Sequence, residues 1–111
     1  MGRKEFLAFM CEEIKLTNLL ENLTNLKWND DENTYQYVNT DESLEWCDYE
    51  MIDLPNPIPY KNDDIEDYID GVMIFGDGTI EFHFQECMDA ENWARFEIEV
   101  MRKVIAELET L

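Results

Sequence analysis

His83 and Cys87 are the two residues whose types best suit nucleophilic catalysis, because an imidazole can activate a nearby thiol. His83 is the only histidine, and it alternates with Phe82 and Phe84 in a run that is typical of a strand with His83 facing solvent. Cys87 lies beyond the end of that run. A zinc site would need two more ligands at a suitable spacing, which the sequence lacks. The pair therefore predicts a surface histidine and no catalytic or metal-binding role.

The carboxylates are too numerous to mark an acid–base pair by themselves, since the chain has 27 Asp and Glu residues. A general acid and base would need an apolar cleft that separates their pKa values, and no pattern marks two acids as buried. Asp77-Gly78-Thr79 matches part of the phosphoryl-transfer pattern Asp-x-Asp-Gly-Thr, but Phe75 stands where the nucleophile should be. The acidic run 30–32 lacks the spacing and central glycine of a calcium loop. We predict no catalytic residue, no metal ligand and no cofactor, and we do not expect an enzyme.

Negative charge is concentrated in the middle of the chain. The 111 residues carry a formal net charge of -19, and residues 28–89 contribute -17 through 18 acids and the single base Lys61. Residues 1–27 are neutral, and residues 90–111 carry -2. A surface this negative repels nucleic acid and anionic lipid, so we expect neither to bind directly. A basic protein surface, such as that of a nuclease or another nucleic-acid-binding protein, is the partner that this charge favours.

The cysteines Cys11, Cys47 and Cys87 are widely spaced and form neither a disulfide framework nor a zinc ribbon. They are typical of reduced cysteines that act as small apolar residues in a cytoplasmic protein. No apolar run reaches the roughly 18 residues that span a bilayer, and the N-terminus lacks the apolar core of a signal peptide. We expect a soluble protein in the cytoplasm, with no membrane contact.

Helical periodicity occurs at both ends of the chain. From Asp89 onward, apolar residues recur every three or four positions and predict a helix with Asp89 as its N-cap. Its apolar face consists of Trp93, Phe96, Val100, Val104, Leu108 and Leu111. A second helix is predicted over 3–26, where the apolar face changes direction near Thr17-Asn18. Either two faces of this helix are covered or the helix bends there, and the sequence leaves both open.

Between the helices the apolar period falls to two, which predicts strands. Residues 72–75 and 80–84 flank a glycine-rich turn and predict a hairpin with Ile80, Phe82 and Phe84 facing the core. A second hairpin is expected from 34–38 and 44–47, and its second strand continues to Leu54 through a bulge near Asp48.

The segment between the two hairpins is predicted to be irregular. Pro55, Pro57 and Pro59 predict an extended loop that does not pair, and residues 63–70 predict a short helical turn that ends at Gly71. We therefore predict one domain over residues 1–111 with an α+β fold. Its antiparallel sheet has about four strands in two hairpins and is flanked by the N- and C-terminal helices, which cover one face.

The acids of the middle segment are expected to form an exposed ridge. Outward side chains on a strand repeat at roughly 6.6 Å, which lets several acids follow the second strand and the neighbouring loops. The partner-binding residues that we predict are Asp30, Asp31, Glu32, Asp41, Glu42, Glu45, Asp48, Glu50, Asp53, Asp63, Asp64, Glu66, Asp67 and Asp70. Any exposed aromatic among Trp28, Trp46, Tyr49 and Tyr60 is expected to anchor an interface.

This excess of acid either serves a partner or is tolerated drift, and composition alone leaves both open. Solubility needs a net charge of only about 2–8 in magnitude. The 17 net negative charges of residues 28–89 correspond to one per roughly 2 Å of a ~34 Å domain, against one per ~1.7 Å of duplex DNA. Because the charges do not all face one way, the effective density is about half of that. Mimicry of a nucleic acid is therefore physically possible.

In small size, acidity and helix–sheet–helix layout, the chain resembles phage-encoded inhibitor proteins, in particular anti-CRISPR proteins that occupy the nucleic-acid groove of a CRISPR nuclease as DNA mimics. The resemblance covers the whole chain in layout and charge, and no sequence motif carries it. It implies a non-enzymatic inhibitor that competes with target DNA through Asp and Glu in place of phosphates. If the gene belongs to a phage, it also implies the cytoplasm of the host cell.

Two other classes remain open. An immunity protein that plugs the basic active site of a toxin nuclease would share the acidity, and a neighbouring toxin gene would identify it. A non-mimic protein-interaction or assembly domain would use an exposed apolar patch instead, and its acids would be dispensable for binding. The oligomeric state is not determined by the sequence.

Overall fold

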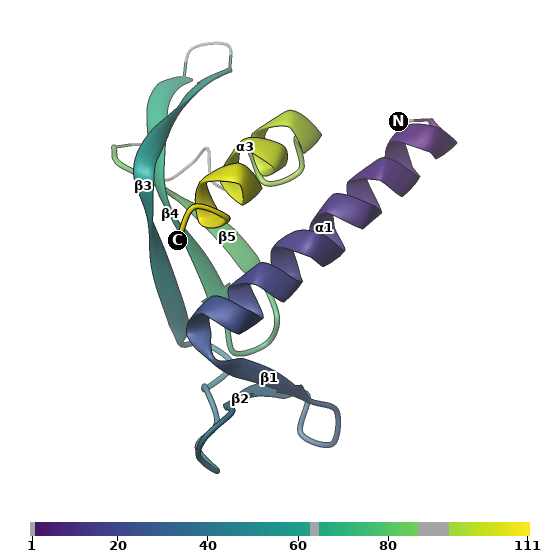
Figure 1. The fold of residues 1–111 in the computed structure, drawn as a ribbon, viewed down its shortest axis with the longest axis vertical. Helices are drawn as coiled ribbons and strands as arrows, with labels where there is room; N and C mark the ends of the chain where they lie inside the picture. Colours follow the sequence, from purple (N-terminus) through teal and green to yellow (C-terminus); the bar gives the residue numbers. More distant parts are fainter. Residues whose placement is uncertain (1, 63–64, 87–93) are drawn as a thin grey trace.

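The structure is a computed structural model that describes residues 2–62, 65–86 and 94–111 (Figure 1). Within these residues, the fold consists of two helices and two antiparallel sheets. The elements in chain order are α1 (Arg3–Thr24), β1 (Leu26–Asn29), β2 (Thr34–Tyr37), β3 (Tyr49–Asn62), β4 (Ile65–Phe75), β5 (Ile80–Phe84) and α3 (Ile98–Leu108). Strands β1 and β2 form one sheet, and the other has the order β3-β4-β5. The predicted α+β class with antiparallel strands and terminal helices is confirmed, with five strands among the described residues.

The core lies between the three-stranded sheet and the helices, which cover one of its faces (Figure 1). Because side chains alternate along a strand, this inner face carries the apolar positions of all three strands. They are Leu54, Ile58, Ile69, Val72, Ile74, Ile80, Phe82 and Phe84, all buried. From the helices, Phe9, Leu16, Leu20, Met101, Val104, Ile105 and Leu108 are buried in the same core. The predicted hairpin that places Ile80, Phe82 and Phe84 inward is therefore confirmed.

Helix α1 is continuous, and only one of its faces is covered. Thr17 donates its hydroxyl to the Glu13 carbonyl at 2.9 Å, a back-bond that fits within the helix without breaking it. The predicted bend near Thr17-Asn18 is therefore absent. Phe6 and Ile14 are 53% and 58% exposed, so the predicted second covered face is absent too.

The structure corrects the predicted hairpin of 34–38 with 44–47. Strand β2 pairs along its length with β1, in the register Leu26↔Tyr37. The expected pairing is present only in part, as the antiparallel bridge between Gln36 and Ser43 and the hydrogen bonds on either side of it, from the Tyr37 N–H to the residue 42 carbonyl at 3.0 Å and from the Leu44 N–H to the residue 35 carbonyl at 2.8 Å. Helix α1 stops before residue 26 because Asn25 adopts the left-handed conformation at φ 57° and ψ 40°. The turn between β1 and β2 then closes on Asn29, whose side-chain oxygen accepts the N–H groups of residues 31 and 32.

The proline-rich segment is a strand, which contradicts the predicted loop. Strand β3 includes Pro55, Pro57 and Pro59, and Pro59 lies opposite Tyr68 of β4. β3 is an edge strand, so a proline whose ring nitrogen points to the free edge removes no hydrogen bond from the sheet. The register shifts between Asp53 and Ile58, where two of the prolines lie. No bulge occurs at Asp48, since residues 46–47 form a turn and β3 begins at Tyr49.

Two further boundaries differ from the predicted ones. Residues 65–70 belong to β4, where Ile65 pairs with Asn62 of β3, so the predicted helical turn is wrong. The C-terminal helix begins at Ile98 because Glu97 has an extended backbone at φ -91° and ψ 115°. The predicted start at Asp89 and the apolar residue Trp93 lie outside the described residues.

Candidate functional site

The outer face of the three-stranded sheet, turned away from both helices, is the first part of the candidate site (Figure 1). Its residues follow from the register, in which Tyr49 lies opposite Phe75 and Met51 lies opposite Met73. The rings of Tyr49 and Phe75 are 5.3 Å apart, and Tyr49 and Met51 are 51% and 40% exposed. We call Tyr49, Met51, Met73 and Phe75 the outer apolar cluster.

A tight acidic turn at residues 45–48 lies at the start of β3, next to this cluster. It is fixed by two backbone hydrogen bonds, from the Asp48 N–H to the Glu45 carbonyl at 3.0 Å and from the Gly76 N–H to the Asp48 carbonyl at 3.0 Å. Between its two exposed acids the turn carries Trp46, which is 65% exposed. Trp46 and Tyr49 are thus the two exposed residues among the four aromatics considered as anchors, since Tyr60 is buried and Trp28 is partly buried.

Nine of the fourteen predicted partner-binding acids are exposed and have no basic nitrogen within 4.0 Å among the described residues. Three lie in the β1–β2 turn, four lie between β2 and β3, one is on β3 and one is on β4. They are Asp30, Asp31, Glu32, Asp41, Glu42, Glu45, Asp48, Asp53 and Glu66. Figure 1 places the β1–β2 hairpin and the connection to β3 at one end of the molecule, far from the N-terminus of α1. Most of these acids therefore belong to one end.

Glu50 does not belong to the exposed ridge, because it lies on the inner face opposite Ile74. Its carboxylate accepts a hydrogen bond from the Tyr37 hydroxyl of β2. That hydrogen bond, with burial and the negative charge of Glu50, raises the pKa of Tyr37 to about 12. Glu50 therefore joins the small sheet to the large one.

Asp67 and Asp70 are also committed to contacts within the fold. Asp67 is 4% exposed and accepts hydrogen bonds from the backbone N–H groups of Tyr68 at 2.7 Å and Glu86 at 3.0 Å. Asp70 lies 2.5 Å from Nδ1 of His83, across the register shift between β4 and β5. The ridge thus excludes Asp67, contrary to the prediction, and the partly exposed His83 is the side-chain partner of Asp70. Asp63 and Asp64 lie outside the described residues.

Positive charge is gathered on the helical side. Lys15 lies 4.0 Å from Glu109, Arg95 lies 2.6 Å from Glu13, and Arg102 lies 3.6 Å from Glu12. All three pairs join α1 to the C-terminal segment. On the sheet side, Asp70 has His83 beside it, and the nine exposed acids named above have no basic nitrogen within 4.0 Å among the described residues. Among the described residues, the helical side therefore holds charges of both signs in ion pairs, whereas most exposed acids of the sheet side lack such a partner.

The predicted set omitted two acids next to these surfaces. Asp77 is exposed in the β4–β5 turn, and Glu81 lies opposite Met73 on the outer face. Both belong to the hairpin that the sequence correctly predicted, and strand alternation places Glu81 opposite to Ile80 and Phe82. Extending that alternation to the acids would have found them.

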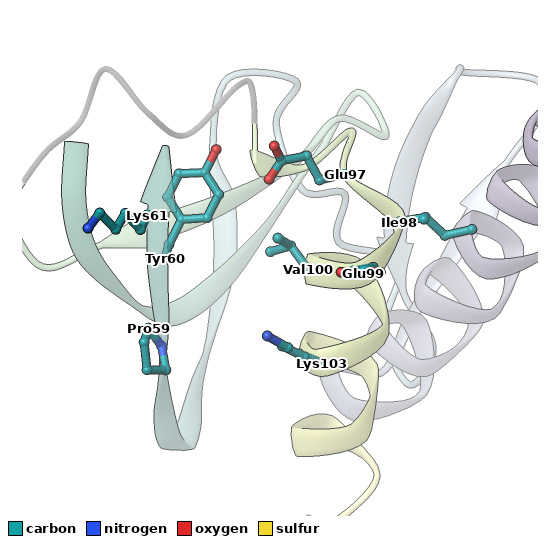
Figure 2. A pocket seen from close by; sticks show the side chains of 8 residues that line it. All are labelled: Pro59, Tyr60, Lys61, Glu97, Ile98, Glu99, Val100 and Lys103. Carbon is teal, nitrogen blue, oxygen red and sulfur yellow. The ribbon is translucent and has the colours of Figure 1, made fainter. Parts of the chain in front are cut away.

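A cavity of about 490 Å³ opens between β3 and the start of α3, as Figure 2 shows. Tyr60 and Pro59 face Val100, Glu97 and Lys103 across it, while Ile98 and Lys61 point away. Because lysines and glutamates line it together, it has no dominant charge that would select an anion or a cation.

The described residues hold no group of three or more His, Cys, Asp or Glu side chains that could bind a metal ion. Within the same residues, neither helix has the length and apolarity that crossing a membrane requires. Cys11 and Cys47 are free, as expected of reduced cysteines, and both are exposed, so neither packs as an apolar residue in the core. Cys87 lies outside the described residues.

Comparison with known proteins gives no match, either to a protein family, to a curated protein or to a solved structure.

Proposed function

We propose that this protein is a non-enzymatic, acidic inhibitor that occupies the basic nucleic-acid-binding groove of a nuclease. A CRISPR-type nuclease is the target that we favour, because its guide–target duplex lies in a positively charged channel that acidic side chains can fill. The partner contact is assigned to the exposed acids around the 45–48 turn, β3 and the β1–β2 hairpin, with Trp46 and Tyr49 as anchors.

The observation that carries this proposal is the separation of charge. Lys15, Arg95 and Arg102 of the helical side pair with acids of that same side. Nine exposed acids of the sheet side have no basic nitrogen within 4.0 Å among the described residues, although Lys61 lies opposite one of them, Glu66, in the register of β3 and β4. Uncompensated charges of one sign raise the free energy of the folded chain through mutual repulsion. A basic partner would relieve this repulsion on binding.

The exposed aromatics add contact area that charge alone lacks. Trp46 is 65% exposed within the acidic turn, and Tyr49 is 51% exposed at the start of β3. Aromatic side chains are enriched among the residues that dominate interface energetics, and Arg and Lys bind to aromatic faces as cations. The acids are therefore expected to govern the association rate, and the two aromatics the residence time.

The test is competition with DNA. A guide-loaded Cas9-type nuclease and a toxin-type DNase are each incubated with the protein, and duplex DNA binding is measured at low salt. We expect competitive loss of DNA binding by the Cas9-type enzyme, and weaker inhibition as NaCl is added. Inhibition of the DNase alone would favour the immunity-protein alternative. If DNA binding by both nucleases is unchanged, the proposal is wrong.

A matched pair of variants isolates the site from net charge. One variant carries Glu45→Gln, Asp48→Asn and Asp53→Asn, and the other carries Glu5→Gln, Glu99→Gln and Glu109→Gln on the helical side. Both raise the net charge by the same amount. We expect the first to weaken inhibition by about tenfold or more and the second to leave it nearly unchanged. Equal effects of the two variants would contradict a localised site.

The non-mimic interaction domain remains the alternative because the outer apolar cluster is partly exposed. The double variant Trp46→Ala, Tyr49→Ala distinguishes this alternative from mimicry of a nucleic acid. If this variant abolishes binding to a partner while the three sheet-side neutralisations do not, apolar contact dominates and the acids are dispensable.

A further inference from the structure

The first half of α1 carries an exposed apolar surface that the fold does not use. Its members are Phe6, Leu7, Met10, Ile14 and Phe96, which are 53%, 52%, 37%, 58% and 57% exposed. Phe96 reaches α1 from the segment before α3, because its ring lies 6.3 Å from that of Phe9. Figure 1 shows this half of α1 extending away from the sheet. We call these five residues the α1 patch.

The spacing along α1 is that of a helix-pairing seam. Leu7, Met10 and Ile14 are separated by three and four residues, the a and d spacing of a two-stranded coiled coil. They lie beside the face that carries the buried Phe9, so α1 presents two apolar faces of which the core covers one. Exposed apolar surface of this kind on a helix fits a second helix.

The size of the patch matches a modest interface. Phe, Tyr and Trp side chains bury roughly 150–250 Å² each, so five large side chains that are about half exposed offer on the order of 500 Å². Two such patches together reach about 1,000 Å², the lower limit for a specific interface.

The distribution of charge along the chain indicates which molecule binds to the α1 patch. Residues 28–89 carry -17, so two copies repel one another wherever those residues face each other, whereas residues 1–27 are neutral. The α1 patch is thus the part of the surface where a second copy can approach with least repulsion. We propose that the protein forms a two-fold symmetric dimer in which the α1 patches of two copies pack together.

The helices are antiparallel in this dimer. A parallel pair would bring the two Arg3-Lys4 ends together, and an antiparallel pair centred near Met10 separates them. This arrangement places Phe6 of one copy opposite Ile14 of the other. Beside Ile14, a hollow of about 280 Å³ lined also by Thr17, Ile80 and Arg95 can receive that phenylalanine ring.

The dimer is independent of the nuclease contact, and salt separates the two. Binding to a basic groove weakens as NaCl is added, whereas association of two acidic copies strengthens because their repulsion is screened. Failure of one proposal therefore leaves the other standing.

Sedimentation velocity of the full chain across a dilution series, at low and at physiological salt, is the main test. We expect a monomer–dimer equilibrium that shifts toward dimer with added NaCl. Ile14→Glu should weaken the dimer by about tenfold or more, because a carboxylate would enter the seam of both copies. Val38→Glu makes the same change at a 57% exposed residue near the β1–β2 hairpin and should have no effect.

Cross-linking tests the antiparallel arrangement. Cys11 is exposed and follows Met10, so the two Cys11 thiols lie near the two-fold axis. A variant with Cys47→Ser and Cys87→Ser should form a Cys11–Cys11 disulfide dimer under mild oxidation, and adding Ile14→Glu should suppress it. A monomer at every concentration and salt, or equal weakening by Val38→Glu and Ile14→Glu, overturns the proposal. Circular dichroism confirms that each variant is folded.

Discussion

Among single residues, the contact between Tyr37 and Glu50 has the most direct effect on stability. The Tyr37 hydroxyl donates to the Glu50 carboxylate and so joins β2 to β3. A carboxylate that is partly shielded from water on the inner face is stabilised by such a donor. Glu50 is therefore a structural residue, whereas Asp48 and Asp53 on either side of it are exposed.

We predict that Tyr37→Phe lowers the free energy of unfolding at neutral pH by about 1–2 kcal/mol, since Glu50 loses a charge-assisted hydrogen bond. The pKa of Tyr37 rises in the folded state from 10.0 to about 12, so this contribution is complete below pH 10 and is lost as pH rises toward 12. The difference between wild type and variant should therefore shrink over that range. Urea unfolding at a series of pH values measures it.

Tyr68→Phe is the control for this prediction. Tyr68 is 49% exposed, and its hydroxyl makes no described hydrogen bond. The variant should match wild type at neutral pH. A Tyr37→Phe variant that is as stable as wild type at pH 7 would show that Glu50 is adequately solvated without its partner.

The positions of individual acids could be predicted from the sequence only where the element was predicted correctly. Glu50 shares strand parity with Ile52 and Leu54, so alternation alone indicates its inward direction. Asp67 shares parity with Ile65 and Ile69, but the expected helical turn hid that relation. Asp70 reaches His83 only because β4 and β5 are adjacent, which no local pattern in either strand specifies.

At the scale of elements, the edge position of β3 explains why its prolines were misinterpreted. Proline excludes a central strand because it removes a donor from the ladder, yet it is tolerated at an edge. An edge of this kind is also protected from pairing with another chain. Whether a strand lies at an edge is a property of the sheet, so the sequence of 55–59 could not decide it.

The end of α1 was predictable in part. The leucine periodicity continues to Leu26 and favours an extension of the helix, but Asn25 is a residue type that adopts the left-handed C-cap. With the helix ended there, residues 26–29 and 34–37 become a hairpin whose acidic turn is held by the side chain of Asn29. By contrast, the glycine-rich hairpin of β4 and β5 was predicted correctly, because its turn and its alternation are both local.

We predict that Gly76→Ala destabilises the protein far more than Gly78→Ala. A Cβ at residue 76 would overlap the carbonyl oxygens of Leu44 and Glu45, so the acidic turn would have to move. At residue 78 the φ of 94° strains an alanine, but its Cβ would meet Trp28 at an ordinary 3.4 Å. We expect a loss of about 1–2 kcal/mol for Gly78→Ala and clearly more for Gly76→Ala.

Thermal unfolding of both variants measures this difference. Trp46 fluorescence, recorded in a background with Trp28→Phe and Trp93→Phe, reports whether the 45–48 turn has moved. Equal melting temperatures for the two variants would mean that the turn is not held against Gly76. In that case the position of Trp46 as an anchor would also lose its structural basis.

For the whole molecule, the uneven distribution of charge is the dominant property. The sequence alone shows that the excess negative charge lies in residues 28–89. The structure adds that the paired charges lie on the helical side and the exposed acids on the sheet side. The ion pairs at Lys15 and Arg102 are partly exposed and are worth only about 0.2–1 kcal/mol each. These two pairs therefore offset little of the repulsion among the exposed acids of the sheet side.

We predict that the melting temperature rises as NaCl is added from low to physiological concentration. The Debye length falls from about 30 Å at 0.01 M salt to about 8 Å at 0.15 M, so added NaCl reduces repulsion among many exposed acids while weakening only a few ion pairs. Each 1 kcal/mol of relieved repulsion raises the melting temperature of a domain this size by roughly 4–8 °C. Differential scanning calorimetry of the monomeric Ile14→Glu variant measures it without a contribution from dimerisation.

The two neutralised triple variants show where the repulsion originates. Glu45→Gln, Asp48→Asn and Asp53→Asn should raise the melting temperature at low salt and reduce its rise with NaCl, because these acids have acidic neighbours and no described basic partner. Glu5→Gln, Glu99→Gln and Glu109→Gln should change both quantities less, since that side carries compensating bases. A melting temperature that is flat or falls with salt would mean that the acids stand too far apart to repel. Acids so widely separated would be too sparse to imitate the closely spaced phosphates of a nucleic acid.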